Sequence, residues 1–320
     1  MDFEYDEKVS TSKWEEIIRN SENSYFFHTP AWAKILEETY SYRIATRLYE
    51  IDGNEVLIPM MEDKKYGFYH YNSIPLGYGG IFSLSDISSE TLQKILKNIV
   101  DWRHLSFNLS LPPFSNFSVP EDSLIKQVNS EWNYTHMLSL ENGFEYIWKN
   151  KFEKNTRTAI RKADRSGFEI LDCNSLDEVR EFYKLYIESS IRWGYKKPPL
   201  PIKLYENIYK FGRPHVRIKL AFKDDNLIAG WGDHYYGKNV FAFLSVYSQG
   251  YERYNPVNLL VKDSIEQACN EGHKYYNFGA SGNLEGVQKF KESFGAEKEK
   301  LKNYRVLSRL GKFADMILKI

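Results

Sequence analysis

The stretch VRIKLAFKDDNLIAGWGDHYYGKNVFAFLSVY, residues 216–247, decides the fold of this chain. It contains three segments rich in β-branched and aromatic residues, at 216–222, 227–236 and 240–247, and such segments are typical of strands. The short turns between them read KDDN and YGKN, and Asp, Asn and Gly are residues that tight hairpin turns favour. The stretch therefore predicts three consecutive strands joined by hairpins.

Helices and strands alternate on both sides of this stretch, as judged from the spacing of apolar residues. In the second half of the chain the pattern predicts helices at 144–165, 175–193, 256–270 and 284–293, and further strands at 168–171, 275–278 and 302–307. The first half repeats the pattern, with helices at 12–20, 30–38 and 91–102 and strands at 44–51, 55–61, 106–111 and 134–140. The sequence therefore predicts an α/β (α+β) fold.

The length of the chain indicates two domains. It has 320 residues, and single domains usually hold about 100–200 residues. A stretch rich in Pro and Ser, residues 112–122, lies between the predicted strands 106–111 and 134–140. We therefore place a loose boundary near residue 130, with an N-terminal domain at 1–130 and a C-terminal domain at 131–320.

The composition excludes several classes of protein. The 43 Lys and Arg residues balance the 43 Asp and Glu residues. This balance argues against a protein that binds DNA generally, because such a protein needs a broad basic surface. The two cysteines, Cys173 and Cys269, have no CxxC partner, so we expect neither a disulfide framework nor a structural zinc site. The acidic start MDFEYDEKVSTSKWEE lacks an apolar core, and no stretch approaches the roughly 18 apolar residues of a membrane span. These observations predict a cytoplasmic protein.

A basic helix is predicted at 144–165. Four cations recur on it at steps of three and four residues and therefore share one face: Lys154, Arg157, Arg161 and Arg165. Most such charged faces are simply solvated. The alternative is a cradle for phosphates, as in a nucleotide-sugar diphosphate or an RNA backbone, because the planar guanidinium binds two oxygens at once.

Three segments in order resemble the Fem-type (FemAB/FemX-like) aminoacyltransferases, which build peptidoglycan cross-bridges from aminoacyl-tRNA. They read NTRTAIRKADRSG, GYERYNPVNLLVKDSIEQACNEGHKYYNFG and GVQKFKESFG, and lie within residues 148–295. They are also similar to the GNAT-like acyltransferases encoded with cell-surface polysaccharide genes. FHTPAWAKIL and SIPLGYGG resemble the family's first domain more weakly. The resemblance implies two GNAT-like domains, each a mixed sheet flanked by helices, with the substrate cleft at or between them.

Two departures from related sequences concern the acyl donor. The chain has no room for the long helical arm of many Fem proteins, so it resembles the armless members. GNAT acetyltransferases bind the pyrophosphate of acetyl-CoA with a Q/R-x-x-G-x-G/A loop, but the corresponding stretch here reads SQGYERYNPVN. The sequence thus leaves the donor open between aminoacyl-tRNA and acyl-CoA, and we expect that no further cofactor and no metal is required.

The resemblance places the reaction near residues 275–295, YYNFGASGNLEGVQKFKESFG. Fem-type enzymes carry a Phe-Lys pair near the aminoacyl end of the donor, and Phe290-Lys291 matches it. Lys291 is expected to face the reacting carbonyl, with Phe290 and Phe294 packed beneath it. Gly279, Ser281 and Gly282 would let the backbone approach the ligand closely. The alternative is that Lys291 is an ordinary exposed helix lysine.

The remaining predicted site residues rest on weaker patterns. Asp233 is the predicted general base, with the neighbouring His234 as the alternative, since alternation turns only one of them toward a cleft. Tyr254 is predicted to bind the substrate and is a second alternative for the base. Arg192 is predicted to bind a carboxylate or phosphate of the acceptor, although a charge that complements the helix dipole explains it equally well. Lys34, beside the predicted core residue Trp32, matches a region that contacts the acceptor in the family.

Together these features predict an N-acyl or aminoacyltransferase of Fem type. It would act on an amino group of a nucleotide- or lipid-linked, phosphate-bearing precursor of the cell envelope, either peptidoglycan or a polysaccharide. A monomer is expected, because two domains can form the cleft without a second chain. The alternatives are a CoA-dependent N-acyltransferase on an amino sugar nucleotide and a non-catalytic domain that binds a glycan or nucleotide through the basic helix.

Overall fold

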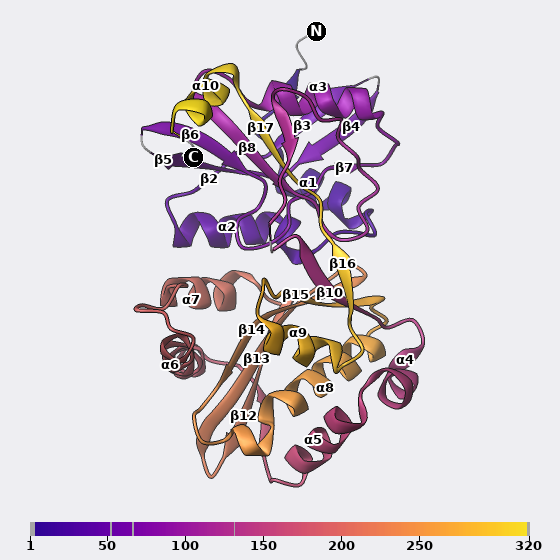
Figure 1. Cartoon of the computed structure of the whole chain (residues 1–320), viewed down its shortest axis with the longest axis vertical. Helices are drawn as coiled ribbons and strands as arrows, with labels where there is room; N and C mark the ends of the chain where they lie inside the picture. The colour runs from indigo at the N-terminus through magenta and orange to yellow at the C-terminus, as the bar shows by residue number, and fades with distance from the viewer. Residues whose placement is uncertain (1–3, 52, 66, 131, 319–320) are drawn as a thin grey trace. The chain divides into compact units, whose positions relative to one another are not determined.

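The computed structural model describes residues 4–51, 53–65, 67–130 and 132–318 (Figure 1). The chain forms two compact units. Unit 1 comprises Met1–Asn133 and Lys300–Ile320, and unit 2 comprises Tyr134–Glu299. In the described part of the chain, every helix is too short or too polar to span a lipid bilayer.

Unit 2 is built on a seven-stranded sheet in the order β11-β12-β13-β14-β15-β10-β16. The strands are β11 (Glu169–Asp172), β12 (Val216–Lys223), β13 (Asn226–Tyr236), β14 (Asn239–Tyr247), β15 (Tyr275–Ala280), β10 (Tyr134–Ser139) and β16 (Glu297–Lys300). The predicted hairpins join β12, β13 and β14, which pair antiparallel in sequence order. The first hairpin turns through Asp224 and Asp225, both with positive φ, as a tight two-residue turn requires. Only the pairing of β14 with β15 is recorded as parallel among the described ladders of this sheet.

Helices cover the sheet of unit 2. They are α4 (Gly143–Tyr146), η2 (Ile147–Lys151), α5 (Lys154–Asp164), α6 (Leu176–Arg192), α7 (Ile202–Phe211), η3 (Glu252–Tyr254), α8 (Pro256–Asn270) and α9 (Glu285–Glu292). The helix α8 packs against β12, β13 and β14, and α5 packs against α8. The core between these helices and the sheet contains Trp231, Tyr276, Phe278 and Phe294.

The helix predicted at 144–165 is wrong as one continuous element. It divides into α4, the π-helical turn η2 and α5, with an extended break at Phe152. The break has a packing cause, because Phe152 turns into the core and contacts Phe144, Trp148 and Phe294. Burying an aromatic ring of this size outweighs the few backbone hydrogen bonds that a straight helix would add.

Unit 1 contains two sheets. The four-stranded sheet has the order β1-β3-β4-β7 and the six-stranded sheet has the order β2-β5-β6-β8-β17-β9. Their strands are β1 (Tyr5–Asp6), β2 (Arg43–Ile44), β3 (Arg47–Ile51), β4 (Asn54–Ile58), β5 (Met61–Lys65), β6 (Phe68–Asn72), β7 (Phe82–Ser83), β8 (His104–Ser110), β9 (Ile125–Gln127) and β17 (Asn303–Leu307). The helices are α1 (Thr11–Arg19), η1 (Phe26–His28), α2 (Pro30–Thr39), α3 (Ser89–Ile99) and α10 (Arg309–Leu318).

The division of unit 1 into two sheets has a local cause. Pro59 lies between β4 and β5, and proline has no N–H to donate to a ladder. At the same level, Ala45 separates β2 from β3, and its N–H donates to the carbonyl of Met60 at 2.9 Å. Two neighbouring strands therefore bend together, and each contributes one half to each sheet.

The end of the chain returns to unit 1. Strand β17 pairs antiparallel with both β8 and β9, and its side chains Tyr304 and Val306 are buried in the core of this unit. Residues 300–320 thus lie in unit 1, whereas the division made from the sequence assigns them to a domain 131–320. A boundary read along the chain cannot detect a strand that inserts between two earlier ones.

Candidate active site

The parallel ladder between β14 and β15 ends inside both strands. The paired residues are Asn239 with Tyr275, Val240 with Tyr276 and Phe241 with Asn277. Strand β14 continues to Tyr247 and β15 continues to Ala280, so the carboxyl-terminal parts of the two strands face each other without ladder pairs. Ligands of open α/β sheets commonly bind beyond the carboxyl ends of parallel strands. We take this end of unit 2 as the candidate active site.

Lys291 reaches this end of the sheet from α9. Its side chain is buried, with 7% of the residue surface exposed, and its Nζ donates to the carbonyl oxygens of Gly279 and Ala280, each at 2.9 Å. Burial lowers the pKa of Lys291 to about 7, because the ammonium form loses hydration. Lys291 is therefore not an exposed helix lysine, which was the alternative that the sequence left open.

Lys289, two residues away on the same helix, provides the contrast. It is exposed, and its Nζ lies 3.4 Å from Glu285, one turn earlier. An exposed pair of this kind contributes little to stability. The two lysines of α9 therefore differ in burial and partners although they share a helix.

The turn that receives Lys291 depends on Gly279. Its φ of +74° lies in the left-handed region, and an added Cβ would lie 3.2 Å from the ring of Phe241. Its N–H donates to Asn277 Oδ1 at 2.8 Å, and the same oxygen accepts a 2.6 Å hydrogen bond from Thr135 on β10. Asn277 thus fixes the backbone whose carbonyls bind Lys291.

Four other polar residues join Lys291 in a buried group. We call Thr135, His136, Asn277, Ser281 and Lys291 the Lys291 cluster; all five are buried. His136 Nδ1 lies 3.5 Å from Ser281 Oγ, and its Nε2 lies 3.6 Å from a carboxylate oxygen of Glu292. Burial, and next the charge of Lys291, lower the pKa of His136, so the neutral imidazole is favoured. Sequence reasoning singled out Ser281 and Lys291 but missed Thr135, His136 and Asn277.

Phe290 and Phe294 anchor α9 beside the cluster. The Phe294 ring is fully buried, with its centroid 5.2 Å from that of Phe290 and 5.0 Å from that of Phe152. Phe290 is half-buried against the same core. The two rings lie on the core side of α9, which is the packing that the sequence predicted for them.

Asp233 lies in the core and not in the Lys291 cluster. Only 2% of its surface is exposed, and its Oδ1 accepts hydrogen bonds from Trp231 Nε1 at 2.8 Å and from the Tyr276 hydroxyl at 2.7 Å. Burial raises its pKa to about 6. The contacts of Asp233 therefore serve a buried hydrogen-bond network, and the structure does not bring it together with Lys291.

His234, the alternative base, is also enclosed. Its ring stacks on that of Phe243 with centroids 4.7 Å apart, and burial lowers its pKa to about 3. A histidine with so low a pKa stays neutral throughout the physiological range. His234 is therefore packed as a core histidine, which favours a structural role over a catalytic one.

We predict that Asp233→Asn leaves the pH dependence of turnover unchanged and alters the pH dependence of stability. In the folded chain this carboxyl keeps its proton up to about pH 6, whereas in the unfolded chain it ionises near its ordinary value of 3.8. Raising the pH between these values therefore favours unfolding of the wild type by up to about 3 kcal/mol. The Asn variant lacks this titration, so its relative stability should rise by that amount from about pH 4 to about pH 7. Urea unfolding measures the difference, and loss of an acidic limb from the pH–rate profile would restore Asp233 as a base.

The predicted phosphate cradle forms a shallow pocket beside α5. Its volume is about 420 Å³, and Tyr146, Trp148, Arg157 and Arg161 contribute to its lining. Arg157 Nη1 donates to the backbone carbonyls of Trp148, Lys149 and Phe152 and so holds the end of η2. Arg161 is exposed, and its guanidinium carbon lies 5.5 Å from the centre of the Trp148 ring. The structure thus brings the two arginines together, with a structural task for Arg157.

Most of the described cations on α5 and at the end of η2 have no ion-pair partner, and Glu145 is the acidic residue in the pocket lining. Among the described residues, Lys149, Lys154, Arg157, Arg161 and Arg165 form no ion pair within 4 Å. Lys151, in contrast, pairs with Glu297 at 3.0 Å. Uncompensated cations around an aromatic ring are suited to binding a phosphate-bearing ligand.

Arg192 and Tyr254 lie at other places in unit 2. Arg192 Nη2 donates to Ser189 Oγ at 2.9 Å and to the carbonyl of Tyr247, the last residue of β14, at 2.8 Å. Its guanidinium also covers the Tyr247 ring at 4.3 Å, so it supports the end of a strand that borders the candidate site. Tyr254 ends η3, and its hydroxyl accepts a 2.8 Å hydrogen bond from Arg253.

Lys34 lies in unit 1. It is exposed on α2 and forms ion pairs with Glu37 at 3.2 Å and Glu38 at 2.9 Å. The neighbouring Trp32 is fully buried, as its interpretation as a core residue requires. The role of Lys34 toward an acceptor stays a prediction.

The segment between β14 and α8 has a composition unfavourable for a pyrophosphate. It forms the short turn η3, and the N–H of Gly250 donates to the Glu252 carboxylate at 2.8 Å. Pro256 occupies the first turn of α8 and cannot donate there. In the described parts of the sequence, no group of three or more His, Cys, Asp and Glu residues is placed to hold a metal ion.

Comparison with known proteins places this geometry in a structural class. Residues 150–292 match the family model described as an acetyltransferase (GNAT) domain, and no curated protein sequence matches the chain. The crystal structure of FemX is similar over 99% of this chain and 100% of that chain, with a TM-score of 0.79 and 13% identity. The C-terminal domain of a putative lysylphosphatidylglycerol synthetase from Agrobacterium fabrum covers 97% of this chain and 95% of its own, with a TM-score of 0.62 and 11% identity. A tandem GNAT protein from the clavulanic acid biosynthesis pathway covers 84% of each chain, with a TM-score of 0.51 and 8% identity.

These likenesses confirm the predicted fold. The chain has a mixed α/β, FemAB-like GNAT fold with two GNAT-like domains. The segment 150–292 carries an acyltransferase domain of the GNAT kind, the enzyme class that the sequence predicted. The matched segment contains α5, the unpaired carboxyl-terminal parts of β14 and β15, and Lys291. It therefore includes most of the candidate active site.

Proposed function

We propose that this chain, which combines the FemX-like fold with a GNAT acyltransferase domain, transfers an aminoacyl or acyl group to an amino group of a cell-envelope precursor. The observation that carries the proposal is the placement of Lys291, whose buried Nζ lies at the carboxyl end of β15 beside the unpaired part of β14. The similarity in fold supports acyl transfer in general and names no substrate. The identity of the donor and of the acceptor rests on the charges and backbone geometry argued below.

Lys291 is suited to stabilise the transition state. The acceptor amine attacks the carbonyl carbon of the donor, a C–N bond forms, and the ester or thioester bond then breaks with departure of the alcohol or thiol. An ammonium has three N–H donors. Two of those on Lys291 donate to the carbonyls of Gly279 and Ala280. The third is assigned to the carbonyl oxygen that becomes negative. A fixed donor to such an oxyanion contributes on the order of 3 kcal/mol.

The attacking amine must also lose a proton. Besides Lys291, His136 is the titratable base of the Lys291 cluster. Its neutral form can accept this proton directly or through the Ser281 hydroxyl at 3.5 Å, and can pass it on to the leaving oxygen or sulfur, which departs as the alcohol or thiol. This assignment replaces Asp233, whose carboxylate oxygen is already bound by Trp231 and Tyr276.

The donor that fits best is an aminoacyl-tRNA. The exposed cations of α5 and the ring of Trp148 offer binding to a phosphate backbone and to bases, whereas Glu252 repels a pyrophosphate at the turn before α8. A CoA thioester is the second candidate, because the family model of residues 150–292 is that of an acetyltransferase domain. The acceptor is proposed to be a nucleotide- or lipid-linked precursor that meets the enzyme in the cytoplasm.

A donor panel separates these possibilities. The full chain is incubated with a UDP-linked muropeptide that carries a free amine, together with either a charged total-tRNA pool or acetyl-CoA. Mass spectrometry of the muropeptide then reports the added mass. An aminoacyl increment with charged tRNA supports the proposal, and an acetyl increment with acetyl-CoA assigns the second candidate. If neither donor gives a product in wild type while thermal shifts report binding, the transferase assignment for this acceptor fails.

We predict that Arg161→Ala raises the KM for aminoacyl-tRNA by about three- to tenfold and lowers the salt slope of binding by about one. Arg161 is exposed and makes no ion pair among the described residues, so its loss should leave the fold intact. Lys162→Ala is the matched control, because Lys162 is an exposed cation on the same helix that does not line the pocket. Equal effects of the two variants would show that only the general charge of α5 matters. Arg157→Ala is unsuitable, because it removes the donors that hold η2.

A further inference from the structure

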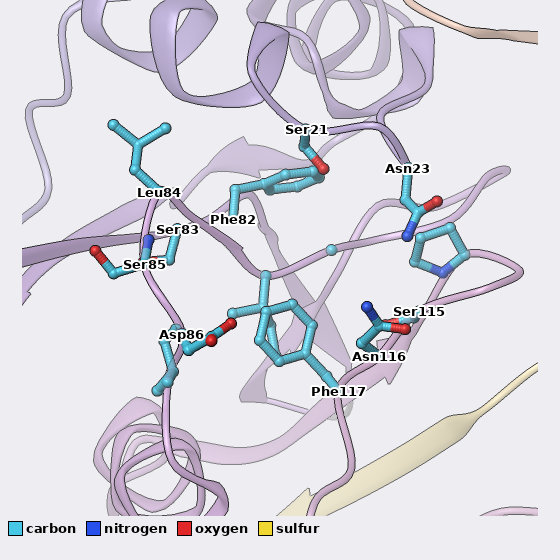
Figure 2. A pocket seen from close by; sticks show the side chains of 14 residues that line it. Ser21, Asn23, Phe82, Ser83, Leu84, Ser85, Asp86, Ser115, Asn116 and Phe117 are labelled. Atoms are coloured by element: carbon cyan, nitrogen blue, oxygen red, sulfur yellow. The ribbon is translucent and has the colours of Figure 1, made fainter.

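Unit 1 contains a pocket of about 540 Å³, and no residue of the Lys291 cluster lines it. Three segments form it: the turn after α1 with Ser21 and Asn23, the stretch 80–87, and the loop 112–117 (Figure 2). In Figure 2, Leu84, Ser85 and Asp86 lie on one side of the pocket and Ser115 and Asn116 lie on the other. Pockets of about 300–1,000 Å³ are the usual size for small-molecule ligands.

The lining of this pocket is polar but almost uncharged. Seven of its fourteen residues have polar side chains: Ser21, Asn23, Ser83, Ser85, Asp86, Ser115 and Asn116. Asp86 is the one charged residue among the fourteen, and none of them is Lys, Arg or His. Among the described residues the Asp86 carboxylate forms no ion pair, and an unpaired carboxylate repels phosphates and carboxylates, so the lining side chains disfavour nucleotides and acidic ligands.

Several of these side chains are free to bind a ligand. Among the described residues, the side chains of Asp86, Ser115 and Asn116 form no hydrogen bond or ion pair with the rest of the chain. Asn116 offers two N–H donors and one acceptor, Ser115 offers both functions, and Asp86 accepts only. Together they provide donors and acceptors on opposite sides of the pocket, which is the pattern that a ring carrying several hydroxyl groups requires.

Apolar surface completes the lining. Phe82 and Phe117 contribute rings, and Ile81 and Ile87 contribute aliphatic carbon. The Phe82 ring is fixed, because it packs at 4.8 Å against His28 and an added Cβ on Gly80 would overlap it. A pyranose presents a C–H face between its hydroxyl edges. The aromatic rings of the pocket complement the C–H face, and the amide and hydroxyl side chains complement the hydroxyl groups.

Hydrogen bonds to backbone carbonyls of the loop 112–117 hold the pocket in shape. Lys302 Nζ donates to the carbonyls of Ser115 at 3.3 Å and Phe117 at 3.0 Å. Asn23 Nδ2 donates to the carbonyl of Phe114 at 3.1 Å and so joins the turn after α1 to the loop. Because Lys302 is engaged with these carbonyls, its charge secures the loop while the side chains of Ser115 and Asn116 stay available. A preformed site of this kind loses little entropy when a ligand binds.

We propose that this pocket binds one neutral sugar unit, a hexopyranose without phosphate or carboxylate. The site is separate from the transfer reaction and needs no donor. It gives the enzyme a second hold on a saccharide, whether as part of the acceptor or as a neighbouring glycan unit.

The test is a titration of the ¹⁵N-labelled full chain with N-acetylglucosamine and with glucose, followed by amide chemical shifts. We expect saturable shifts at Ser83, Ser85 and Asn116 in the millimolar range for at least one of the two sugars. Glucuronate, which carries a carboxylate, is expected to bind at least fivefold more weakly, and Asp86→Asn should reduce this discrimination. Because no acyl donor is present, the result is independent of whether the transferase assignment holds.

Matched variants tie the binding to the pocket. Ser85→Phe fills the space from an exposed position and should abolish the shifts, whereas Ser123→Phe, at an exposed serine of unit 1 outside the lining, should leave them unchanged. Asn116→Ala should weaken binding about three- to tenfold, and the exposed Asn129→Ala should not. The proposal is overturned if neither sugar gives saturable shifts, if Ser85→Phe leaves them intact, or if glucuronate binds as well as the neutral sugars.

Discussion

Lys291→Met is expected to lower kcat/KM for acyl transfer by about 10²–10³-fold at about pH 6, with a smaller effect at higher pH. The magnitude is that of removing one donor from an oxyanion site. The pH dependence follows from the pKa of about 7 that burial gives to Lys291, since above that pH the folded wild type itself loses the ammonium. The ratio of wild-type to variant activity should therefore fall about tenfold per pH unit above about pH 7.

The ratio of wild-type to variant kcat/KM at each pH does not depend on the ionisation of the acceptor amine, because both enzymes use the same amine. Steady-state assays from about pH 6 to about pH 9 measure it. Lys289→Met is the control, since Lys289 is exposed on the same helix and pairs only with Glu285. It should keep the wild-type rate and profile. A Lys291→Met enzyme that stays within about threefold of wild type at pH 6, or a ratio that does not change with pH, rules out the proposed role.

The same substitution is expected to stabilise the fold progressively as the pH falls. In the unfolded chain Lys291 keeps its proton up to its ordinary pKa of 10.5, whereas in the folded chain it releases the proton above about 7. Between these values the unfolded state binds more protons, so the stability of the wild type falls as the pH is lowered. The full penalty, about 5 kcal/mol, is present below about pH 7.

The methionine variant has no such titration. Its free energy of unfolding, relative to wild type, should therefore increase by about 3 kcal/mol between about pH 9.5 and about pH 6. The carbonyls of Gly279 and Ala280 lose their donor in the variant, but this cost is constant with pH and leaves the slope unchanged. Urea unfolding of both proteins at several pH values measures the slope. A difference that is flat with pH would mean that Lys291 keeps its ordinary pKa in the folded state, as a hydrated ammonium does.

The two results together would separate catalysis from folding. A variant that is more stable at pH 6 and yet nearly inactive cannot owe its inactivity to unfolding. Such an exchange of stability for activity is common where a buried charge serves the reaction. The Asp233→Asn variant supplies the opposite case, because a buried carboxyl in the core should affect stability alone.

Much of the fold could be predicted from local patterns. The three strands of residues 216–247 and their two hairpin turns are encoded by neighbouring residues, and Asp224 and Asp225 are placed where a tight turn needs positive φ. Phe290 lies on α9 and Phe294 two residues past its last residue, Glu292, and their spacing of four residues predicts that both rings turn to one side, toward the core. The break at Phe152 was missed, because helical spacing continues across it while the packing of its ring decides the backbone.

Local patterns were enough to predict the three strands of residues 216–247, the class of fold and the position of Lys291 beside a core phenylalanine. Only the tertiary structure decided that Lys291 is buried at the end of β15 and that His136 and Thr135 join it there, since His136 lies 145 residues from its partner Ser281. It also decided that Asp233 belongs to the core. The physical reason is that periodicity and turn chemistry act between residues close in sequence, whereas burial, hydrogen-bond partners and pKa arise from strands and helices that meet only through long-range pairing.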